Sequence, residues 1–525
     1  MLKKITGGVM MAVRKQLIAT TASVLLALAG TAFAASPSLA MSHPVAHRSA
    51  APSGTIDIGL SADPPKLDPS LSSALVDRQV MINLYDTLFQ LSATGMLEPD
   101  LATGYTVSKD GMTYTLQLRK GVMFQDGTPF NAAAVKFNLE RDQLKISPRH
   151  SSLSAISGID VTGPYTIVLH LSKPFSPLLN VLAGRAGMMV SPTAVKKEGA
   201  GFLNDPVGTG PYEFVKRVVG SYIDLKANPH YWVKGEPHFE NVEYKIFTDP
   251  NVELLNLQSG AVQFIDTVPP QQVSSMEMTS GYTVINKPSF GYQGIYLNVK
   301  AAPFTNLFLR EAINNAVNRS LLVGAIFRGT AVPAYSPFGP ASPAYVKSED
   351  TPPAVNPTLI RKLLKEGGKP KGFSFTMQTA TSPLDVQIAE IIQSMLKPYG
   401  IQMNIDQLDF GTMLNNSADG NFTAMALGWS GRLDPDQDIY SFFYSGAPLN
   451  SSQYSNPKVD ALLNQARETS DMAVRKAIYA KAMAIINHDS PYVFLYHPNN
   501  VLAYSNSIKG FVYIPDGLIR VATLS

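Results

Sequence analysis

Short stretches of alternating apolar and polar residues recur along the chain and predict β-strands. Residues 113–119 and 165–171 alternate with a period of two, as half-buried strands do. Residues 371–379, 401–409 and 422–429 indicate further strands, each lying between helix-like segments. Because strands and helices alternate in this way, the pattern predicts a mixed α/β fold whose sheets are covered by helices.

Polar residues that favour helix starts mark the predicted helices. Asn131 is placed to cap a helix over residues 132–141, and Asn356-Pro357 and Asn456-Pro457 each combine a cap with proline at the first helical position. Thr305 or Asn306 opens one long predicted helix that ends near Arg328, where Gly329 is placed to stop it.

The length of 525 residues predicts two or three compact lobes. The strand at 294–299 follows a stretch containing Gly and Pro, and we interpret it as the crossing between lobes. The strand-like residues Phe511–Ile514 are expected to return to the first lobe. The predicted division is 1–34 signal peptide, 35–53 flexible lead-in, 54–295 first lobe with an inserted subdomain at about 90–200, 296–497 second lobe, and 498–525 return to the first lobe.

The N-terminus has the pattern of an export signal. Four basic residues flank or precede the apolar run 17–29, and the small-residue pattern Ala32-Phe33-Ala34 follows, so we expect cleavage after Ala34. Translation from Met10 or Met11 would leave this signal intact. Without the first 34 residues the formal charge of +3 becomes −1, from 39 basic and 40 acidic residues. Near-neutral charge gives no electrostatic reason to bind nucleic acid or anionic lipid.

The chain contains no cysteine. Disulfides, a lipid-bearing thiol, cysteine nucleophiles and thiolate metal sites are therefore excluded. We expect an exported protein that diffuses freely in the periplasm, without a membrane anchor, as a monomer.

Motifs for catalysis or cofactor binding are missing. There is no HExxH or P-loop pattern, and the GWSGR sequence at 428–432 has Arg where a nucleophile elbow needs Gly. His43 and His47 have an i, i+4 spacing, but they lie in the lead-in. The sequence therefore predicts neither an enzyme, nor a metal site, nor a cofactor.

Four groups of motifs resemble the family 5 extracellular solute-binding proteins of ABC importers for peptides, nickel and glutathione. They occur in order across nearly the whole chain after the signal: the run 101–141; PVGTGPY at 206–212 with NPHYW at 228–232; PF at 303–304 with LREAI at 309–313 and NR at 318–319; and GW at 428–429 with DPD at 434–436, YSNP at 454–457 and DALL at 460–463. Most of these residues also have a local role, such as the turns at Asp110-Gly111 and Asp126-Gly127.

The resemblance implies a two-lobe type II periplasmic-binding-protein fold of the large peptide-binding class, with an extra subdomain in the first lobe. A ligand would be captured between the lobes and presented to the permease subunits of an importer. The sequence 124–136 looks similar to the glutathione-binding branch of the family. Small peptides or peptide-like solutes, glutathione among them, are thus the expected ligands. Nickel chelates or opine-type solutes are the alternative, and a secreted hydrolase or a chaperone-like surface protein are alternatives from other classes.

The loop after the predicted strand at 422–429 holds the main candidates for ligand binding. Trp429 either lines the cleft or belongs to a core. Peptide-binding relatives carry in this loop an Asp that anchors the ligand's ammonium group, and Arg432 stands in its place. Arg432 suits a ligand carboxylate, which it can hold with two hydrogen bonds, or else a surface or inter-lobe ion pair. Asp434 either substitutes for the missing Asp or caps the next helix.

Other candidates for the cleft come from positions that match those of relatives. Ser72 and Ser73 belong to the loop that begins at Ser70, Tyr292 and Tyr296 flank or belong to the crossing strand, and Tyr440 follows the Trp429 loop. For each of these side chains, ordinary packing is the alternative role.

Overall fold

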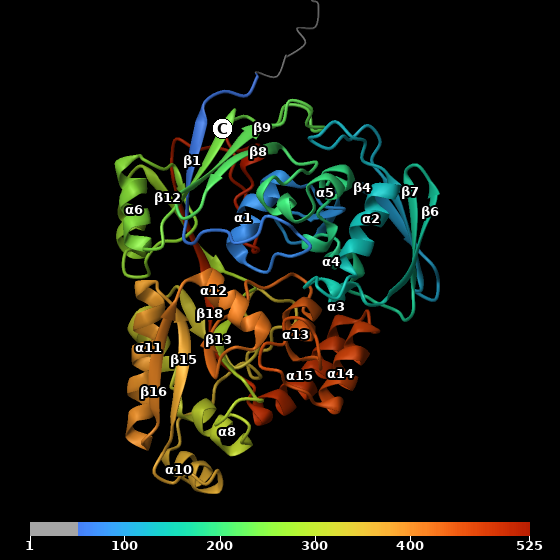
Figure 1. Ribbon diagram of the computed structural model, residues 1–525. Helices are drawn as coiled ribbons and strands as arrows, with labels where there is room; N and C mark the ends of the chain where they lie inside the picture. The colour runs from blue at the N-terminus through green and yellow to red at the C-terminus, as the bar shows by residue number, and fades with distance from the viewer. Residues whose placement is uncertain (1–50) are drawn as a thin grey trace, which may run out of the picture. The chain divides into compact units, whose positions relative to one another are not determined.

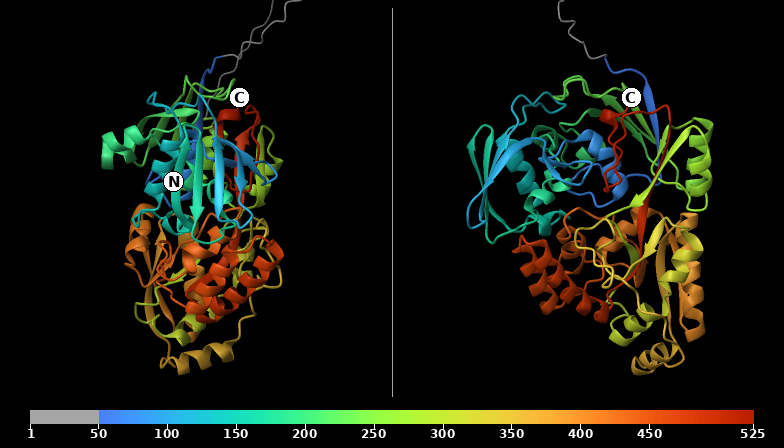
Figure 2. Two further views of the ribbon diagram at one scale, coloured as in Figure 1. Left: turned by 90° about the vertical axis from the view of Figure 1, so that its right-hand side faces the viewer. Right: turned by 180° about the vertical axis from the view of Figure 1, so that it is seen from behind.

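The computed structural model describes residues 51–525, which belong to one compact unit. The predicted signal peptide, most of the predicted lead-in, and His43 and His47 lie outside the described residues. Figures 1 and 2 show a mixed α/β architecture in which helices pack against twisted sheets. The predicted fold class is confirmed at this level.

One sheet runs through most of the described chain. It contains twelve strands, in the order β16-β15-β17-β13-β18-β11-β1-β10-β9-β8, and β12 and β14 also pair with β18. Its members are β1 (Thr55–Leu60), β8 (Tyr212–Val218), β9 (Tyr222–Ala227), β10 (Asn241–Ile246), β11 (Phe264–Ile265), β12 (Tyr282–Pro288), β13 (Gln293–Leu297), β14 (Ala331–Pro333), β15 (Ser374–Ala380), β16 (Gln402–Leu408), β17 (Ala424–Ala426) and β18 (Tyr492–Ser505).

Strand β18 joins the two halves of this sheet. Its first half pairs with β13 and β14, as far as the pair Ala331 and Pro498. Its second half pairs with β11 and β12, from the pair Pro288 and Asn499 onward. We call the elements built on β1, β8–β12 and the second half of β18 the first lobe, and those built on β13–β17 and the first half of β18 the second lobe.

The first lobe carries two further small sheets. Four antiparallel strands pair in the order β4-β5-β7-β6, and β2 pairs with β3. Their bounds are β2 (Phe89–Leu91), β3 (Leu97–Pro99), β4 (Ala102–Val107), β5 (Thr113–Leu118), β6 (Ile156–Gly163) and β7 (Thr166–Leu171). These strands share a core of their own with the helices between residues 132 and 182, separate from the core around β1 and β10.

The helices of the first lobe position the loops that face the second lobe. They are α1 (Leu75–Leu84), α2 (Ala132–Asp142), α3 (His150–Leu153), α4 (Leu178–Val181), α5 (Pro192–Glu198), α6 (Pro250–Ser259) and α7 (Val273–Met278), with 3₁₀ turns η1 (Arg185–Gly187), η2 (Gly199–Asn204) and η4 (Val521–Thr523). Helix α1 ends against the 206–212 bend, where a Cβ on Gly210 would lie 2.5 Å from the carbonyl carbon of Leu84. Gln125 Nε2 also donates to the carbonyls of Leu84 (3.1 Å) and Tyr212 (2.7 Å), which fixes α1 in place.

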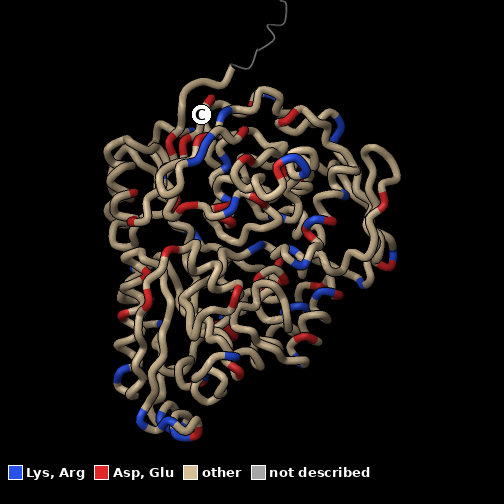
Figure 3. Tube along the Cα trace, viewed as in Figure 1, with Lys and Arg blue, Asp and Glu red and all other residues tan. Residues whose placement is uncertain are grey.

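The second lobe has parallel strands β16, β15 and β17 covered by helices. Its helices are α8 (Leu307–Ala316), α9 (Arg319–Ile326), α10 (Pro357–Glu366), α11 (Pro383–Leu396), α12 (Phe410–Asp419), α13 (Asp436–Phe443), α14 (Pro457–Arg467) and α15 (Met472–Asp489), with a 3₁₀ turn η3 (Lys397–Tyr399). Two buried clusters fill this lobe, one beside α8–α11 and one beside α13–α15. Lys and Arg are interspersed with Asp and Glu along the chain trace (Figure 3).

The helices predicted from a single capping asparagine were confirmed. The side chain of Asn131 accepts from Ala134 N, that of Asn356 from Leu359 N, and that of Asn456 from Lys458 N. The predicted single helix from 306 to 328 was wrong, because α8 ends at Ala316 and α9 begins after a second cap. At the break, Asn318 accepts from Leu321 N, while Arg319 donates to the carbonyls of Asn314 and Val317 at the end of α8.

The predicted strand at Phe511–Ile514 was also wrong, since these residues form no β-ladder. Phe511 packs its ring on Phe264, at a centroid distance of 5.0 Å, and on Tyr504 at 5.3 Å. Further along, Ile519, Val521 and Leu524 are buried in the core around β1. The last segment therefore joins the first lobe through side-chain packing and through hydrogen bonds between its backbone and the side chains of Gln79 and Asn83 on α1, rather than through strand pairing.

Candidate ligand-binding site

The loop between β17 and α13 is hydrogen-bonded to the residue that immediately precedes β13. Trp429 N donates to Tyr292 O at 2.8 Å, and Tyr292 N donates to Trp429 O at 2.9 Å. Gly431 has a φ of +72°, and a Cβ there would lie 2.2 Å from the Phe290 backbone. Only glycine combines this left-handed backbone with so close an approach. The glycines of the loop therefore set the positions of Trp429 and Arg432.

Asp438, at the start of α13, holds both of these residues. Its Oδ1 accepts from Trp429 Nε1 at 3.1 Å and from the backbone N of Arg432 at 2.8 Å. The Arg432 guanidinium lies over the Trp429 ring, 4.3 Å from the ring centroid, in cation–π contact. The loop, the ring and the guanidinium thus form one ordered unit on the second lobe. No motif of the sequence indicated Asp438.

Arg432 is only partly satisfied by this unit. Its Nη1 donates to Ser430 Oγ at 3.2 Å and to the Gly431 carbonyl, but its Nη2 has no acceptor among residues 51–525. Asp438 Oδ2 likewise has no donor among the described residues. Both atoms are buried, so the second lobe presents one unpaired cationic group and one unpaired carboxylate oxygen.

Three arginines of the first lobe have the same character as Arg432. Arg78 lies on α1, Arg149 precedes α3 and Arg185 begins η1, and with Arg432 all four are at most 6% exposed. Five further guanidinium nitrogens find no acceptor in the described chain: Arg78 Nε and Nη1, Arg149 Nε and Nη2, and Arg185 Nη1. We call these four residues the arginine cluster. Its three members in the first lobe were not predicted from the sequence.

The members of the arginine cluster act on one another electrostatically. Burial lowers the pKa of Arg432 and of Arg185 well below the usual value, and the positive charges of Arg78 and Arg149 lower both pKa values further. Burial also lowers the pKa values of Arg78 and Arg149 to about 10. Arg432 is thus among the groups that feel the charge of the three first-lobe arginines, although it stands on the loop of the second lobe.

Nearby carboxyl groups compensate the cluster only in part. Arg78 lies 3.5 Å from Asp516, which is itself held by Arg520 at 2.7 and 3.1 Å. Arg149, Arg185 and Arg432 form no salt bridge within the described residues. Burial raises the pKa of Asp77 to about 6 and that of Asp142 to about 7, so both give up part of their negative charge near neutral pH.

The two predicted serines occupy different positions beside the cluster. Ser72 is buried; its Oγ donates to Asp77 Oδ2 at 2.7 Å and accepts from Arg185 Nε at 3.0 Å. Ser73 is half-buried, and its side chain forms no hydrogen bond within the described residues. Ser72 therefore orients a cluster arginine, while Ser73 keeps a freer hydroxyl close by.

The three predicted tyrosines are buried in the second lobe's core. Tyr292 donates through its hydroxyl to Asp438 O at 3.3 Å, and Tyr296 packs its ring on Tyr492 at 4.7 Å. Tyr440 donates to Asn464 Oδ1 at 3.2 Å and lies under the guanidinium of Arg467. Packing thus accounts for each ring, and Tyr292 also braces the helix turn that carries Asp438.

Asp434 is fully engaged by its own lobe. It accepts from Arg475 Nη1 at 3.1 Å and from Arg475 Nη2, and its Oδ1 accepts from Asp436 N at 3.0 Å at the start of α13. A longer contact of 3.5 Å comes from Asn180 Nδ2 in the first lobe. These bonds match a role in starting α13.

Direct hydrogen bonds connect the lobes beside the cluster. Ser151 Oγ lies 2.9 Å from Ser441 Oγ, and Arg467 Nη1 donates to Ser151 O at 3.0 Å. Ser176 Oγ donates to Thr469 O at 2.8 Å. Helices α3 and α13 face each other across this junction in Figure 1. The lobes are therefore in contact two residues after Arg149, at Ser151, and on α13, the helix that follows the loop of Arg432.

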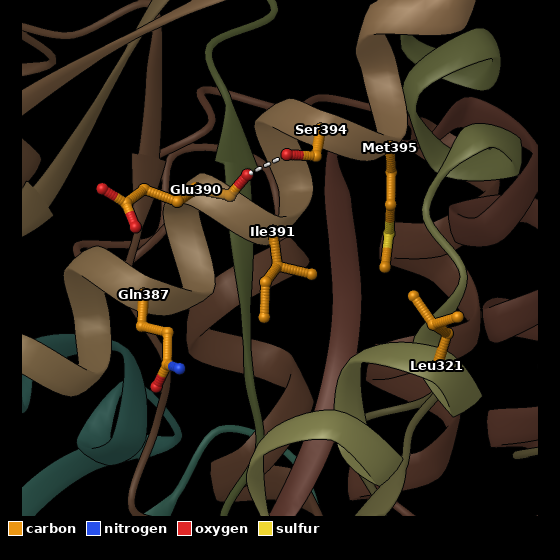
Figure 4. Close-up of a pocket in the computed structure, with 6 residues that line it drawn as sticks. All are labelled: Leu321, Gln387, Glu390, Ile391, Ser394 and Met395. Carbon is orange, nitrogen blue, oxygen red and sulfur yellow. Dashed lines mark hydrogen bonds between the residues drawn. The ribbon is translucent and has the colours of Figure 1, made fainter.

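Other hollows and polar groups offer weaker sites. The depression in Figure 4 lies between α9 and α11, and Glu390 is the one charged residue of its lining, beside Leu321, Gln387, Ile391, Ser394 and Met395. The buried His497 has Nδ1 2.9 Å from Gly291 O and Nε2 3.0 Å from Asp350 Oδ2, so acceptors of the protein lie beside both ring nitrogens. Within residues 51–525, no three His, Asp or Glu side chains are grouped to hold a metal ion. None of the described helices is long and apolar enough to cross a membrane.

Comparison with known proteins gives matches over most of the chain. The model of the bacterial extracellular solute-binding proteins, family 5 middle, matches residues 96–451. Glutathione-binding protein GsiB of Escherichia coli strain K12 is 34% identical over 463 residues, which cover 86% of this chain and 90% of that protein. GsiB of Shigella dysenteriae has the same identity and coverage.

Two solved structures are similar over 90% of this chain and 98% of their own. The periplasmic binding protein AgaA from A. tumefaciens R10, in complex with agropinic acid, has 26% sequence identity and a TM-score of 0.83. The periplasmic binding protein DppA from Helicobacter pylori, in complex with the peptide STSA, has 27% identity and a TM-score of 0.82.

Proposed function

The chain belongs to the family 5 bacterial extracellular solute-binding proteins, and from this premise we propose that it captures a small peptide-like solute in the periplasm and delivers it to the permease of an ABC importer. The fold is that of the type II periplasmic peptide-binding proteins. Members of the family bind substrates for transport and are not enzymes. The export pattern at the N-terminus supports the periplasmic location.

Arg432 is the observation that carries the choice of ligand. It is buried in the loop where peptide-binding relatives have an Asp, it is stacked on Trp429, and its Nη2 has no acceptor among the described residues. A guanidinium in this state suits a carboxylate, which accepts charge-assisted hydrogen bonds from it. Glutathione carries two carboxylates and one ammonium group, and the identity of 34% to GsiB supports it as the ligand.

Trp429 and Arg432 are the side chains that we assign to direct ligand contact. Ser73, half-buried beside Ser72, is assigned to the opposite side of the site. Ser72, Asp434, Tyr292, Tyr296 and Tyr440 are assigned to positioning, because their polar groups or rings are already engaged by the protein.

Opine-type solutes are the second candidate. The similarity to AgaA, solved with agropinic acid, favours them, as does the replacement of the loop Asp by Arg432. A site that holds a carboxylate without an ammonium anchor would prefer such a solute to glutathione.

Isothermal titration calorimetry of the protein without its signal peptide tests the function. The titrants are glutathione, alanyl-alanine, agropinic acid and the nickel–histidine complex. We expect saturable binding of glutathione. Tighter binding of agropinic acid would change the assigned ligand from glutathione to an opine, while the function as a solute-binding protein would stand. Absence of binding for every titrant would contradict capture of a peptide-like solute. The permease partnership is checked by deleting the gene and measuring uptake of labelled glutathione, which we expect to fall.

A further inference from the structure

We propose that Arg78, Arg149, Arg185 and Arg432 form a single buried anion site, divided between the two lobes, which selects solutes carrying two or more carboxylate groups. This inference rests on the proposed capture function and names the chemistry of its ligand. It adds three residues that no motif of the sequence indicated. It also predicts that ordinary dipeptides and tripeptides, which have a single terminal carboxylate, are poor ligands.

The strongest support is a contrast within the same chain. Four other arginines with little exposure each hold an aspartate through two hydrogen bonds: Arg141 with Asp68, Arg467 with Asp436, Arg475 with Asp434, and Arg520 with Asp516. Two further buried arginines, Arg310 and Arg319, lack an aspartate partner but donate to backbone carbonyls, and none of their buried nitrogens is left without an acceptor within the described residues. Cluster members lack such a partner, apart from the 3.5 Å contact of Arg78 with Asp516.

Leaving these groups unpaired is unfavourable in the closed arrangement of the lobes. A buried cation that lacks an acceptor loses its hydration without compensation, and like charges that share a low-dielectric space repel each other. Six guanidinium nitrogens of the cluster are in this situation. Oxyanions remove both penalties at once, because they accept hydrogen bonds and neutralise the charge.

The division of the arginine cluster between the two lobes determines how many anionic groups the solute needs. Arg78, Arg149 and Arg185 come from the first lobe, whereas Arg432 stands on the loop of the second lobe. One carboxylate has two oxygens and pairs well with one or two guanidinium groups. A solute with one carboxylate would therefore leave the arginines of one lobe unpaired, and a solute with two can serve both.

Asp438 indicates where the uncharged or cationic part of the solute lies. Its Oδ2 is unpaired within the described chain; burial raises the pKa of this carboxyl well above its usual value, and the positive charge of Arg432 opposes that shift. An ammonium group beside a carboxylate, as at the amino-acid end of glutathione, matches this pair. The remaining carboxylate of such a solute would then face Arg78, Arg149 and Arg185.

Calorimetry with matched ligands tests the selection. Glutathione is compared with its glycine monoethyl ester, which lacks one carboxylate, and with trialanine, which has a single carboxylate at similar length. We expect glutathione to bind at least about tenfold more tightly than either, the size expected for one lost charge-assisted pair. Sodium phosphate and sodium sulfate are titrated as free oxyanions, and we expect them to bind weakly at millimolar concentration.

Variants of the first lobe locate the effect. Arg149→Gln and Arg185→Gln are each expected to weaken glutathione binding about tenfold or more and to leave the monoethyl ester nearly unaffected. Arg361→Gln removes an exposed arginine of α10 and is the control, with binding unchanged. Thermal unfolding of each variant separates lost ligand contacts from misfolding: we expect the melting temperature of Arg149→Gln to stay at or above that of the wild type, and that of Arg185→Gln to fall slightly, because Arg185 also donates to Ser72 Oγ and Ala74 O.

The outcomes distinguish the two proposals. Equal affinity for glutathione and trialanine, or unchanged glutathione binding by both cluster variants, would overturn the anion site and leave the capture of peptides intact. Tight phosphate binding without glutathione binding would overturn the assignment to carboxylates. Failure of every peptide-like solute to bind would contradict the proposed function itself.

Discussion

Buried arginines in this protein fall into two groups. In one group the protein supplies hydrogen-bond acceptors for the guanidinium, and in the other some guanidinium nitrogens have no acceptor within the described residues. Arg467 has its acceptors within the protein: Asp436 at 2.8 and 3.0 Å, and Ser151 O at 3.0 Å. Arg149 is equally buried, but its Nε and Nη2 have no acceptor within the described residues. Burial and residue type are the same, so the difference lies in pairing alone. We therefore expect Arg467 to contribute to stability and Arg149 to contribute to ligand binding.

Substitution of each arginine by methionine gives the first prediction. Arg467→Met leaves Asp436 buried without its partner, and we expect a loss of about 3–5 kcal/mol in the free energy of unfolding. Arg149→Met removes a charge that has no partner, so we expect no loss of stability in the ligand-free protein. Urea unfolding followed by circular dichroism measures both. A destabilisation by Arg149→Met as large as that by Arg467→Met would show that Arg149 is structural.

At the scale of elements, single capping residues predicted where helices begin, but the sequence did not predict the boundary between two adjacent helices. Asn131, Asn356 and Asn456 each precede one helix, and each side chain caps it. Between 306 and 328, two capping asparagines stand in one apolar stretch, and the sequence does not show that Arg319 ends α8 by donating to its carbonyls. At Phe511 the aromatic pattern resembles a strand, but the rings pack on Phe264 without a ladder. Such outcomes depend on tertiary contacts.

The β17–α13 loop gives the second prediction. Gly431→Ala places a Cβ 2.2 Å from the Phe290 backbone at a φ of +72°, so the loop must move and carry Trp429 and Arg432 with it. Gly446→Ala is the matched control, because Gly446 has a φ of +73° and no atom within 4 Å of the added Cβ.

We expect the control to lose about 1–2 kcal/mol, the cost of the left-handed backbone for alanine. Gly431→Ala should lose more than this and should also weaken glutathione binding in calorimetry. If both variants lose the same stability and both keep wild-type affinity, the loop is not held in place by its contact with Phe290.

At the scale of the whole described chain, the site is a product of topology. Arg78, Arg149, Arg185 and Arg432 are far apart in sequence, and no spacing connects them. Only Arg432 was predicted, because it stands in a loop whose motif is recognisable. The other three stand on α1, before α3 and in η1, and of these elements α3 contacts the second lobe directly, where Ser151 meets Ser441. Strand β18 pairs with both halves of the large sheet, so it fixes how far the lobes can move apart.

Repulsion within the arginine cluster gives the last prediction, which concerns lobe closure. When the lobes meet, Arg432 approaches three arginines of the first lobe, and this opposes closure until an anionic solute neutralises them. The ligand-free protein should therefore be more open than the glutathione complex, with a larger radius of gyration in small-angle X-ray scattering. Replacing Arg149 and Arg185 together by Gln should lower the radius of the ligand-free protein, because the repulsion that opposes closure is removed. Arg361→Gln should leave it unchanged. An open double variant would indicate that the hinge, rather than the charge of the cluster, sets the resting position of the lobes.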